Sequence, residues 1–389
     1  MRNGIGFLLL GYVLSQFYRA FLAVLAPMLG ADLGTTPDSL ARASGLWFLA
    51  FALAQLPVGW ALDRIGPRRT TGFLLGVLGS AGALVFAAAQ GPGWVTAAMV
   101  LLGLGCSPVL MSSYLILARV YPVAVFATMA GAILGAGSLG NIAAAWPLTL
   151  AAEALGWRGA MVLLAGVTAL VGLPIWRWVE DPGPAPDAGQ GSLLDLLRIP
   201  ALWLILPMTA VNYAPSAGIR GLWVGPYFDE VFGAGTTLIG QASLVMAFAM
   251  VLGNFAYGPL DRLLGTRKGV VLAGNLAGAA CLAALWALPA DSPWAAAALL
   301  AGVGCFGASY PMLMAHARAL FPPHLVGRGV TLMNLFCIGG VGLFQLASAR
   351  VHSAAGPGAE AAYGALFGFF GLLLLVGCAV YAFSRDRTD

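Results

Sequence analysis

Long apolar stretches, separated by short charged or Pro/Gly-rich interruptions, follow one another along the whole chain. A helix that crosses a bilayer needs about 20 mostly apolar residues, and twelve stretches come close to that length. The pattern therefore predicts an all-α membrane protein with twelve transmembrane helices in a lipid bilayer. The expected spans are 5–29, 43–62, 70–90, 95–118, 123–151, 159–179, 201–228, 237–257, 269–289, 294–316, 329–349 and 361–383.

The composition agrees with this pattern. Of the 389 residues, 60% are hydrophobic and 9% are charged, whereas soluble proteins carry about 25% charged residues. A net charge of +4 over this length gives no basic surface of the kind that binds nucleic acid. No nucleophile–base or metal-ligand spacing occurs at a helix end, so we expect neither an enzyme nor a cofactor.

The positions of lysine and arginine predict the orientation, because cationic loops are retained in the cytoplasm. With the N-terminus inside, the outer loops hold only Arg42, Arg158 and Arg350, and Arg19 and Arg220 lie within helices. The rest of the 19 basic residues face the cytoplasm. We expect a multi-pass protein with both termini cytoplasmic that functions as a monomer. The Ala/Gly-rich composition favours a bacterial inner membrane.

One long polar segment divides the chain into six helices and six more. It begins at Glu180 with EDPGPAPDAGQG, a sequence that is flexible and has nothing to bury. We therefore expect an N-terminal six-helix bundle at 1–179, a cytoplasmic linker at 180–200 and a C-terminal six-helix bundle at 201–389.

The two halves repeat one another at an offset of 199 residues. The same offset holds across three separate loops, which indicates an internal duplication. Duplicated helical bundles are characteristic of secondary transporters, whose substrate site lies between the repeats near the middle of the membrane. Matching pairs include Gly103 with Gly302, Cys106 with Cys305, and Arg119 with Arg318.

The loop after the second helix of each half carries a recognisable motif. It reads GWALDRIGPRR from Gly59 and, with the aspartate one residue early, GPLDRLLGTRK from Gly258. It resembles the GxxxDRxGxRR signature of the major facilitator superfamily (MFS). The resemblance implies two pseudo-symmetric six-helix bundles, transport by alternating access, and charged loops that latch the inner ends. The implied gating residues are Asp63, Arg64, Arg68, Asp261, Arg262 and Arg267.

Helix five contains Gly131, Gly135, Gly137 and Gly140. This spacing resembles a degenerate form of the glycine motif of MFS antiporters, without its usual proline. The alternative interpretation is close helix packing through small residues.

Two arginines are predicted within the membrane, where a charge costs at least about 2.5 to 3.5 kcal/mol and therefore suggests a functional site. Arg19 and Arg220 lie in the equivalent helices one and seven, and no acidic residue falls near the middle of any span. A guanidinium binds carboxylate or phosphate through two parallel hydrogen bonds. We therefore expect a small-molecule anionic substrate, unless each arginine only caps backbone carbonyls or reaches a neighbouring helix.

The residues around the two arginines are duplicated as well. Each arginine shares one helical face with a tyrosine and a serine at spacings of seven and four. The arrangement resembles that of MFS organophosphate antiporters, and also anion:cation symporters with an arginine in helix one. The expected substrate-binding residues are Arg19, Arg220, Tyr12, Ser15, Gln16, Tyr213, Ser216, Trp223, Tyr114, Tyr310, Asn141 and Asn334.

Proton-driven transport usually needs a titratable group near the site, and the three histidines do not provide one in this interpretation. His316 is expected at the inner end of helix ten, and His324 and His352 in loops. Anion exchange or facilitated flow therefore fits the sequence better, although a proton could travel with the substrate.

Three other functions remain open. Thioether groups select copper, and Met246, Met250, Met312 and Met314 in helices eight and ten would suit a copper importer of this superfamily. The same scaffold could instead form a metabolite or drug exporter, or a transporter-like sensor. The two arginines count against a purely cationic or neutral substrate.

Overall fold

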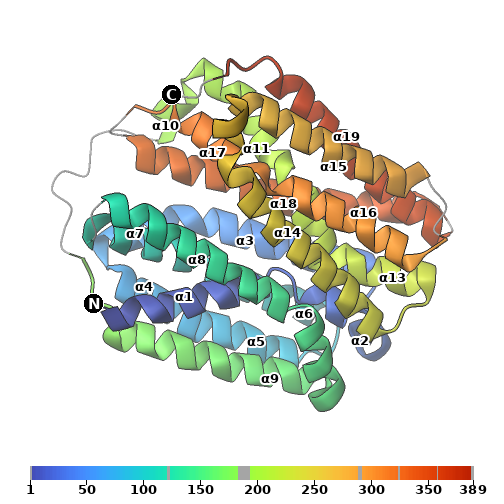
Figure 1. The fold of residues 1–389 in the computed structure, drawn as a ribbon. Helices are drawn as coiled ribbons and strands as arrows, with labels where there is room; N and C mark the ends of the chain where they lie inside the picture. The colour runs from blue at the N-terminus through green and yellow to red at the C-terminus, as the bar shows by residue number, and fades with distance from the viewer. Residues whose placement is uncertain are drawn as a thin grey trace. The chain divides into compact units, whose positions relative to one another are not determined.

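Every regular element in the described part of the chain is a helix. The computed structural model describes residues 2–120, 123–182, 193–287, 291–322, 325–356 and 358–386. Contacts divide the chain into two units, Met1–Asp187 and Ala188–Asp389 (Figure 1). The predicted linker at 180–200 overlaps residues 183–192, which lie outside the described residues.

The first unit is built from long helices joined by short turns. Several begin at a proline, whose fixed φ suits the first helical position. The elements are α1 (Arg2–Phe17), α2 (Leu22–Leu33), α3 (Pro37–Arg64), α4 (Pro67–Phe73), the π-helix η1 (Leu74–Gly79), α5 (Ser80–Ala87), α6 (Pro92–Cys106), α7 (Val109–Val120), α8 (Val123–Ala143) and α9 (Trp146–Trp178).

The second unit repeats this arrangement after a short helix, α10 (Leu193–Leu197). Its first spanning segment is divided into several short pieces. The elements are the 3₁₀-helix η2 (Pro200–Leu204), α11 (Leu206–Asn212), α12 (Ala214–Gly218), the π-helix η3 (Ile219–Trp223), α13 (Val224–Phe232), α14 (Thr236–Leu264), α15 (Arg267–Ala287), α16 (Pro293–Phe306), the 3₁₀-helix η4 (Gly307–Ser309), α17 (Tyr310–Arg318), α18 (Val326–Ala354) and α19 (Ala359–Tyr381).

Within the described residues, nine helical segments are long and apolar enough to cross a bilayer, and α1 with α2 forms a tenth, bent by 52°. Two interrupted segments complete the twelve. In one, α8 continues into α9 as far as Gly156, whose φ of 71° marks a kink; the other runs from η2 to α13. Large apolar side chains such as Leu170 and Phe255, each 71% exposed, suit contact with lipid. The predicted twelve-helix class is confirmed.

The structure corrects three details of the predicted spans. The first helix, expected to run unbroken over 5–29, is interrupted between Phe17 and Leu22. The seventh is a series of α, π and 3₁₀ pieces. The eleventh extends to Ala354, so His352 lies in the last turn of α18 and not in a loop. Hydropathy indicates which segments lie in the bilayer. It does not indicate whether the backbone hydrogen bonds of a segment form one continuous helix.

The two units use the same helix pairings. In the first, α1 packs along α8, α3 along α6, and α5 along α9. In the second, α11 packs along α18, α14 along α16, and α15 along α19. These are equivalent pairs, so the repeat read from the sequence corresponds to a repeated packing arrangement.

Glycines at equivalent positions set both the turns and the closest helix contacts. Gly34 and Gly233, 199 residues apart, end α2 and α13 with φ values of 64° and 61°, a conformation that favours glycine. A Cβ at Gly140 of α8 would overlap the Val13 carbonyl, and a Cβ at Gly340 of α18 would overlap that of Ala210. The helix-five glycines at 137 and 140 therefore act in close packing, whereas a Cβ at Gly135 would meet no atom within 4 Å.

Candidate functional site

Arg19 lies at the break between α1 and α2. Residues 18–21 form turns between the two helices, and the N–H groups of Arg19 and Ala20 donate to carbonyls three residues earlier, those of Gln16 at 3.3 Å and Phe17 at 2.9 Å. Only 9% of Arg19 is exposed. Interrupted helices are common at the ligand sites of membrane transporters.

Two aromatic rings of α3 hold the Arg19 guanidinium. Its Cζ lies 4.8 Å from the Phe51 ring centre and 5.6 Å from that of Trp47, and the two rings stack on each other at 5.3 Å. The Nε of Arg19 is buried and has no hydrogen-bond partner among the described residues. Aromatic faces stabilise a cation without neutralising it, so the guanidinium keeps its capacity for an anion.

The other expected ligands of helix one are arranged on the same stretch. Gln16 Nε2 donates to the Tyr12 hydroxyl at 3.1 Å, and Ser15 is 1% exposed. The Tyr12 ring packs against Gly137 of α8. The structure thus brings Tyr12 and Gln16 into direct contact.

Arg220 lies within the π-helix η3 and is 2% exposed. A π-helical turn inside an α-helix costs hydrogen-bond geometry and is often found at functional sites. Two expected neighbours have contacts inside the unit. Ser216 is fully buried and its hydroxyl donates to the Tyr213 carbonyl at 3.2 Å, and the Trp223 indole Nε1 donates to the Ser348 hydroxyl at 2.9 Å.

The remaining expected site residues are spread over four helices. Tyr114 on α7 and Tyr310 on α17 are half-buried, Asn334 on α18 is half-buried, and Asn141 on α8 is buried. Tyr310 directly follows the 3₁₀ turn η4, so helix ten also changes its winding at the expected site.

A buried amide cluster in the second unit was missed by the sequence interpretation. Asn212 Nδ2 donates to Asn275 Oδ1 at 2.8 Å and to the Ser309 hydroxyl at 2.7 Å. Asn275 Nδ2 donates to the same hydroxyl at 3.1 Å. All three side chains are at most 1% exposed. Asn212 directly precedes the duplicated Tyr213, and this adjacency is the one signal in the sequence that could have found it.

The predicted gating loop of the first unit makes contacts within that unit. Asp63 Oδ1 accepts from Arg119 Nη2 at 3.0 Å, and Arg64 lies over the Trp60 ring at 5.9 Å. Arg68 Nε donates to the Trp176 carbonyl at 2.6 Å. In the second unit Arg267 begins α15, and the side chains of Asp261 and Arg262 lie outside the described residues.

One acid follows the last helix of each unit, and neither of these two acids was predicted. Asp181 Oδ1 accepts the Arg68 backbone N–H at 2.8 Å. Asp386 accepts the Lys268 backbone N–H at 3.0 Å and the Thr266 hydroxyl. Each carboxylate therefore caps the first turn of the unit's third spanning helix, α4 or α15. Partial burial by itself raises the pKa of Asp386, but hydrogen bonds from Thr266 and Lys268 outweigh it and lower that pKa below its usual value.

The thioethers considered for copper belong largely to the core. Met246, Met250 and Met312 are at most 6% exposed, and the first two pack against Gly304 of α16. Among the described residues no group of three or more His, Cys, Asp or Glu side chains could hold a metal ion. Met246 and Met250 therefore contribute to helix packing.

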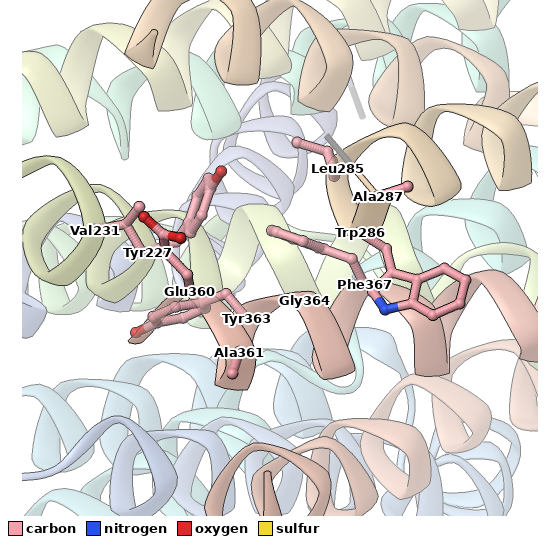
Figure 2. Close-up of a pocket in the computed structure, with 10 residues that line it drawn as sticks. All are labelled: Tyr227, Val231, Leu285, Trp286, Ala287, Glu360, Ala361, Tyr363, Gly364 and Phe367. Carbon is pink, nitrogen blue, oxygen red and sulfur yellow. The ribbon is translucent and has the colours of Figure 1, made fainter. Parts of the chain in front are cut away.

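A cavity of about 370 Å³ opens at the end of the second unit that carries Glu360. Figure 2 shows Tyr227, Val231 and Glu360 on one side of it and Leu285, Trp286 and Ala287 on the other. It lies between α13, α15 and α19, at the end of these helices predicted to face outward.

The family model of the Major Facilitator Superfamily matches this chain twice, at residues 8–222 and 205–389. The chain belongs to the Major Facilitator Superfamily. The superfamily resemblance read from the loop motif is thereby confirmed, and the protein is a membrane transporter rather than an enzyme.

Solved structures with the same fold cover nearly all of this MFS chain. A bacterial homologue of the human lysosomal transporter Spinster, inward-facing and unoccupied, has 18% identity and a TM-score of 0.74, over 98% of this chain and 96% of that one. A D-xylose–proton symporter has 13% identity and a TM-score of 0.80, over 98% and 97%.

A nucleoside transporter has 13% identity and a TM-score of 0.78, over 97% of this chain and 98% of that one. No curated protein matches the sequence. At these identities the likeness shows the fold alone.

Proposed function

We propose that this MFS transporter carries a small organic or phosphorylated anion, with Arg19 and Arg220 as its principal ligands. The observation that carries the proposal is the placement of both guanidiniums. Both arginine residues are at least 91% buried. Each lies in the first spanning helix of its unit, at the point where that helix departs from regular α-helical winding.

The surroundings of Arg19 support an anionic ligand. A buried cation costs several kcal/mol unless it is paired and hydrogen-bonded. Around Arg19, the described residues offer the faces of Trp47 and Phe51, worth about 0.5 to 2 kcal/mol as cation–π contacts. They place no carboxylate within ion-pair distance of Arg19. A substrate carboxylate or phosphate would supply the missing charge.

The chemistry of guanidinium limits the substrate class. Its planar fork matches carboxylate and phosphate oxygens, and it stays charged at any physiological pH. One arginine from helix one and one from helix seven also form the pattern that resembles the organophosphate branch of the superfamily. Tyr12 and Gln16 would then contact the uncharged part of the anion.

A binding screen tests the proposal. Purified protein is heated with phosphate esters, carboxylates, nucleobase-like or flavin-like anions, and copper, each in excess. An anion at 100 times its dissociation constant should stabilise the protein by about 2.7 kcal/mol. Arg19→Lys and Arg220→Lys should each weaken binding about 10-fold or more, because lysine cannot form the bidentate contact.

Arg158→Lys is the matched control. Arg158 also lies over an aromatic ring, that of Trp157 at 4.1 Å, but it is exposed near a helix kink and far in sequence from both ligands. Its substitution should leave anion binding unchanged. Anion binding that survives both Arg19→Lys and Arg220→Lys defeats the proposal, and stabilisation by copper alone would favour the copper importer.

The same proposal includes the location and assembly of the protein. The distribution of basic residues supports a bacterial inner membrane with both termini and the 180–200 linker in the cytoplasm. Reporter fusions at residues 1, 190 and 389 should all report the cytoplasmic side, and light scattering of the purified protein should give the mass of a monomer. A fusion at 190 that reports the outer side would overturn the topology.

A further inference from the structure

The cavity between α13, α15 and α19 of the second unit is separate from the proposed anion site (Figure 2). Among the described residues that line it, none belongs to the expected anion ligands. Its volume of about 370 Å³ lies within the range of about 300 to 1,000 Å³ that small-molecule sites occupy. The cavity is therefore large enough for a second ligand, and its lining determines which chemistry that ligand has.

Three buried rings form one wall of the cavity. The centre of the Tyr227 ring lies 5.2 Å from that of Tyr363 and 5.0 Å from that of Phe367. Each of these residues is at most 4% exposed. Packing inside the unit therefore holds the three rings in place, so this aromatic wall exists before any ligand arrives.

A fourth ring lies on the opposite side of the cavity. Trp286 of α15 is 63% exposed, and Figure 2 shows it across from Tyr227. Two glycines of α19 leave room for its indole. A Cβ at Gly364 would lie 3.5 Å from Trp286 Cδ1, and a Cβ at Gly368 would lie 3.7 Å from Trp286 Cδ2. The indole therefore rests against α19, and much of the ring remains accessible to a ligand.

The charge beside these rings is negative. Glu360, in the first turn of α19, lines the cavity and is exposed. A second carboxylate, that of Glu230, accepts from the Tyr363 hydroxyl at 2.9 Å. Arg350 of α18 is exposed, but α18 contributes no described residue to the cavity lining, and none of the described lining residues is basic. The cavity therefore favours a cation over an anion.

Aromatic rings and a carboxylate together favour one kind of cation. Calcium and magnesium need several oxygen ligands, and Glu360 is the one carboxylate among the described lining residues. An ammonium group with apolar substituents gains from both kinds of side chain, because the rings attract its charge and cover its alkyl surface. Tryptophan is the strongest ring for this contact.

We propose that this cavity binds an alkylammonium group, with Glu360 as its counter-ion and with Trp286 and Tyr227 as its aromatic contacts. The site does not depend on the proposed anion function. It lies at the end of the helices predicted to face outward, at the level of the lipid headgroups. A dissolved organic amine and the amine of a lipid headgroup can both reach this level, and they share the ammonium chemistry.

Calorimetry with tetraethylammonium tests the site in the full chain, purified in an uncharged detergent. The wild type should bind one molecule per chain. Glu360→Gln should weaken binding about 5-fold, the effect of losing one exposed ion pair. Glu153→Gln is the matched control, because it removes an exposed acid from the predicted outer end of the first unit. Its affinity for tetraethylammonium should equal that of the wild type.

Two further variants test the walls of the cavity. Trp286→Leu should weaken binding about 2- to 5-fold, because it removes a cation–π contact. Trp294→Leu should have no effect, since Trp294 is also exposed, at 53%, but does not line the cavity. Ala361 lines the cavity and is exposed, so Ala361→Phe fills the space without disturbing the core. This variant should abolish binding, whereas simple attraction to a surface charge would survive it.

Nanodiscs distinguish the two sources of the ammonium group. Phosphatidylglycerol is mixed with phosphatidylethanolamine or, in the same proportion, with diacylglycerol, which has no amine. Weaker tetraethylammonium binding to the wild type in the discs with phosphatidylethanolamine supports the site and assigns it to a lipid headgroup. Equal binding in both kinds of disc supports the site and assigns it to a dissolved amine.

Two results would overturn the proposal. One is the absence of tetraethylammonium binding in the amine-free discs. The other is binding that remains unchanged in Glu360→Gln or in Ala361→Phe. Arg19→Lys should leave the affinity for tetraethylammonium unchanged, so the outcome is independent of the anion screen, and failure of one proposal leaves the other standing.

Discussion

The two units match at their ends and differ in their middles. At the predicted inner ends, Asp181 and Asp386 cap equivalent helices. At the predicted outer ends, an acid of the first spanning helix accepts a hydrogen bond from an aromatic residue near the start of the last one. Asp32 accepts from Trp157 Nε1 at 2.7 Å in the first unit, and Glu230 accepts from the Tyr363 hydroxyl in the second.

The middles have diverged. In the first unit Arg19 lies in a break of the helix and is held by two aromatic rings. In the second, Arg220 lies in a π-helix, and an amide cluster that includes Asn275 is buried in the same unit. The equivalent of Asn275 in the first unit is Gly76, where a Cβ would lie 3.2 Å from Gly172 Cα. The duplicated helices therefore make different contacts at equivalent positions in the two units.

The largest expected effect tests the shared helix contact. Gly140→Leu and Gly340→Leu should each destabilise the protein by about 3 kcal/mol or more, because the new side chain overlaps a backbone carbonyl that cannot move aside. The temperature of thermal unfolding and the yield of monodisperse protein measure this loss of stability. Gly135→Leu, on α8 but in open space, should have little effect. If Gly340→Leu is tolerated and Gly140→Leu is not, the two halves do not depend on the same contact.

The amide cluster gives the next largest effect. Asn275→Leu removes a partner from Asn212 and from Ser309, and buried polar groups left without partners cost about 1 to 3 kcal/mol. Thermal unfolding should detect the loss. Asn254→Leu on α14 is the control, because that amide is exposed. A more stable Asn275→Leu protein would mean that the amide cluster does not stabilise the second unit.

The capping acids should contribute about 0.5 to 2 kcal/mol each, as helix caps do. The pKa of the Asp386 carboxyl is lower in the folded protein than in the unfolded chain, where it is near 3.9. The stability that this carboxylate contributes is therefore present above the unfolded-state pKa and is lost as the pH falls through the folded-state pKa. Wild type and Asp386→Asn should therefore differ in unfolding temperature at pH 7 and converge below about pH 4. Asp181→Asn should lower the unfolding temperature at pH 7 by a similar amount. An unchanged unfolding temperature would mean that the caps at the two predicted inner ends are not equivalent.

The smallest effect on stability is expected at Asp63. Its ion pair with Arg119 joins side chains that are 63% and 21% exposed, and such pairs contribute about 0 to 1 kcal/mol. Asp63→Asn should change the transport rate and the balance between conformations, with ligand choice unchanged. Altered ligand choice with intact kinetics would contradict the gating role.

Several features could be predicted because they depend on composition along one segment. The twelve spans follow from hydropathy, and the depth of Arg19 and Arg220 follows from their positions in those spans. The capping acids were missed because a cap depends on two segments that are more than 100 residues apart, such as Asp181 and Arg68. His352 was placed in a loop because the apolar pattern of helix eleven fades before the helix ends.

Residue order and polarity alone were enough to predict the membrane class, the duplication, the superfamily motif and two arginines within the membrane. The contacts of Arg19, the helices that lose their regular winding and the polar groups that meet in the core could be known only from the folded chain. Those outcomes depend on side chains from different helices competing for the same space and the same hydrogen bonds. Phe51 beside Arg19, Asn212 beside Asn275, and His352 between Trp223 and Tyr363 are contacts of that kind.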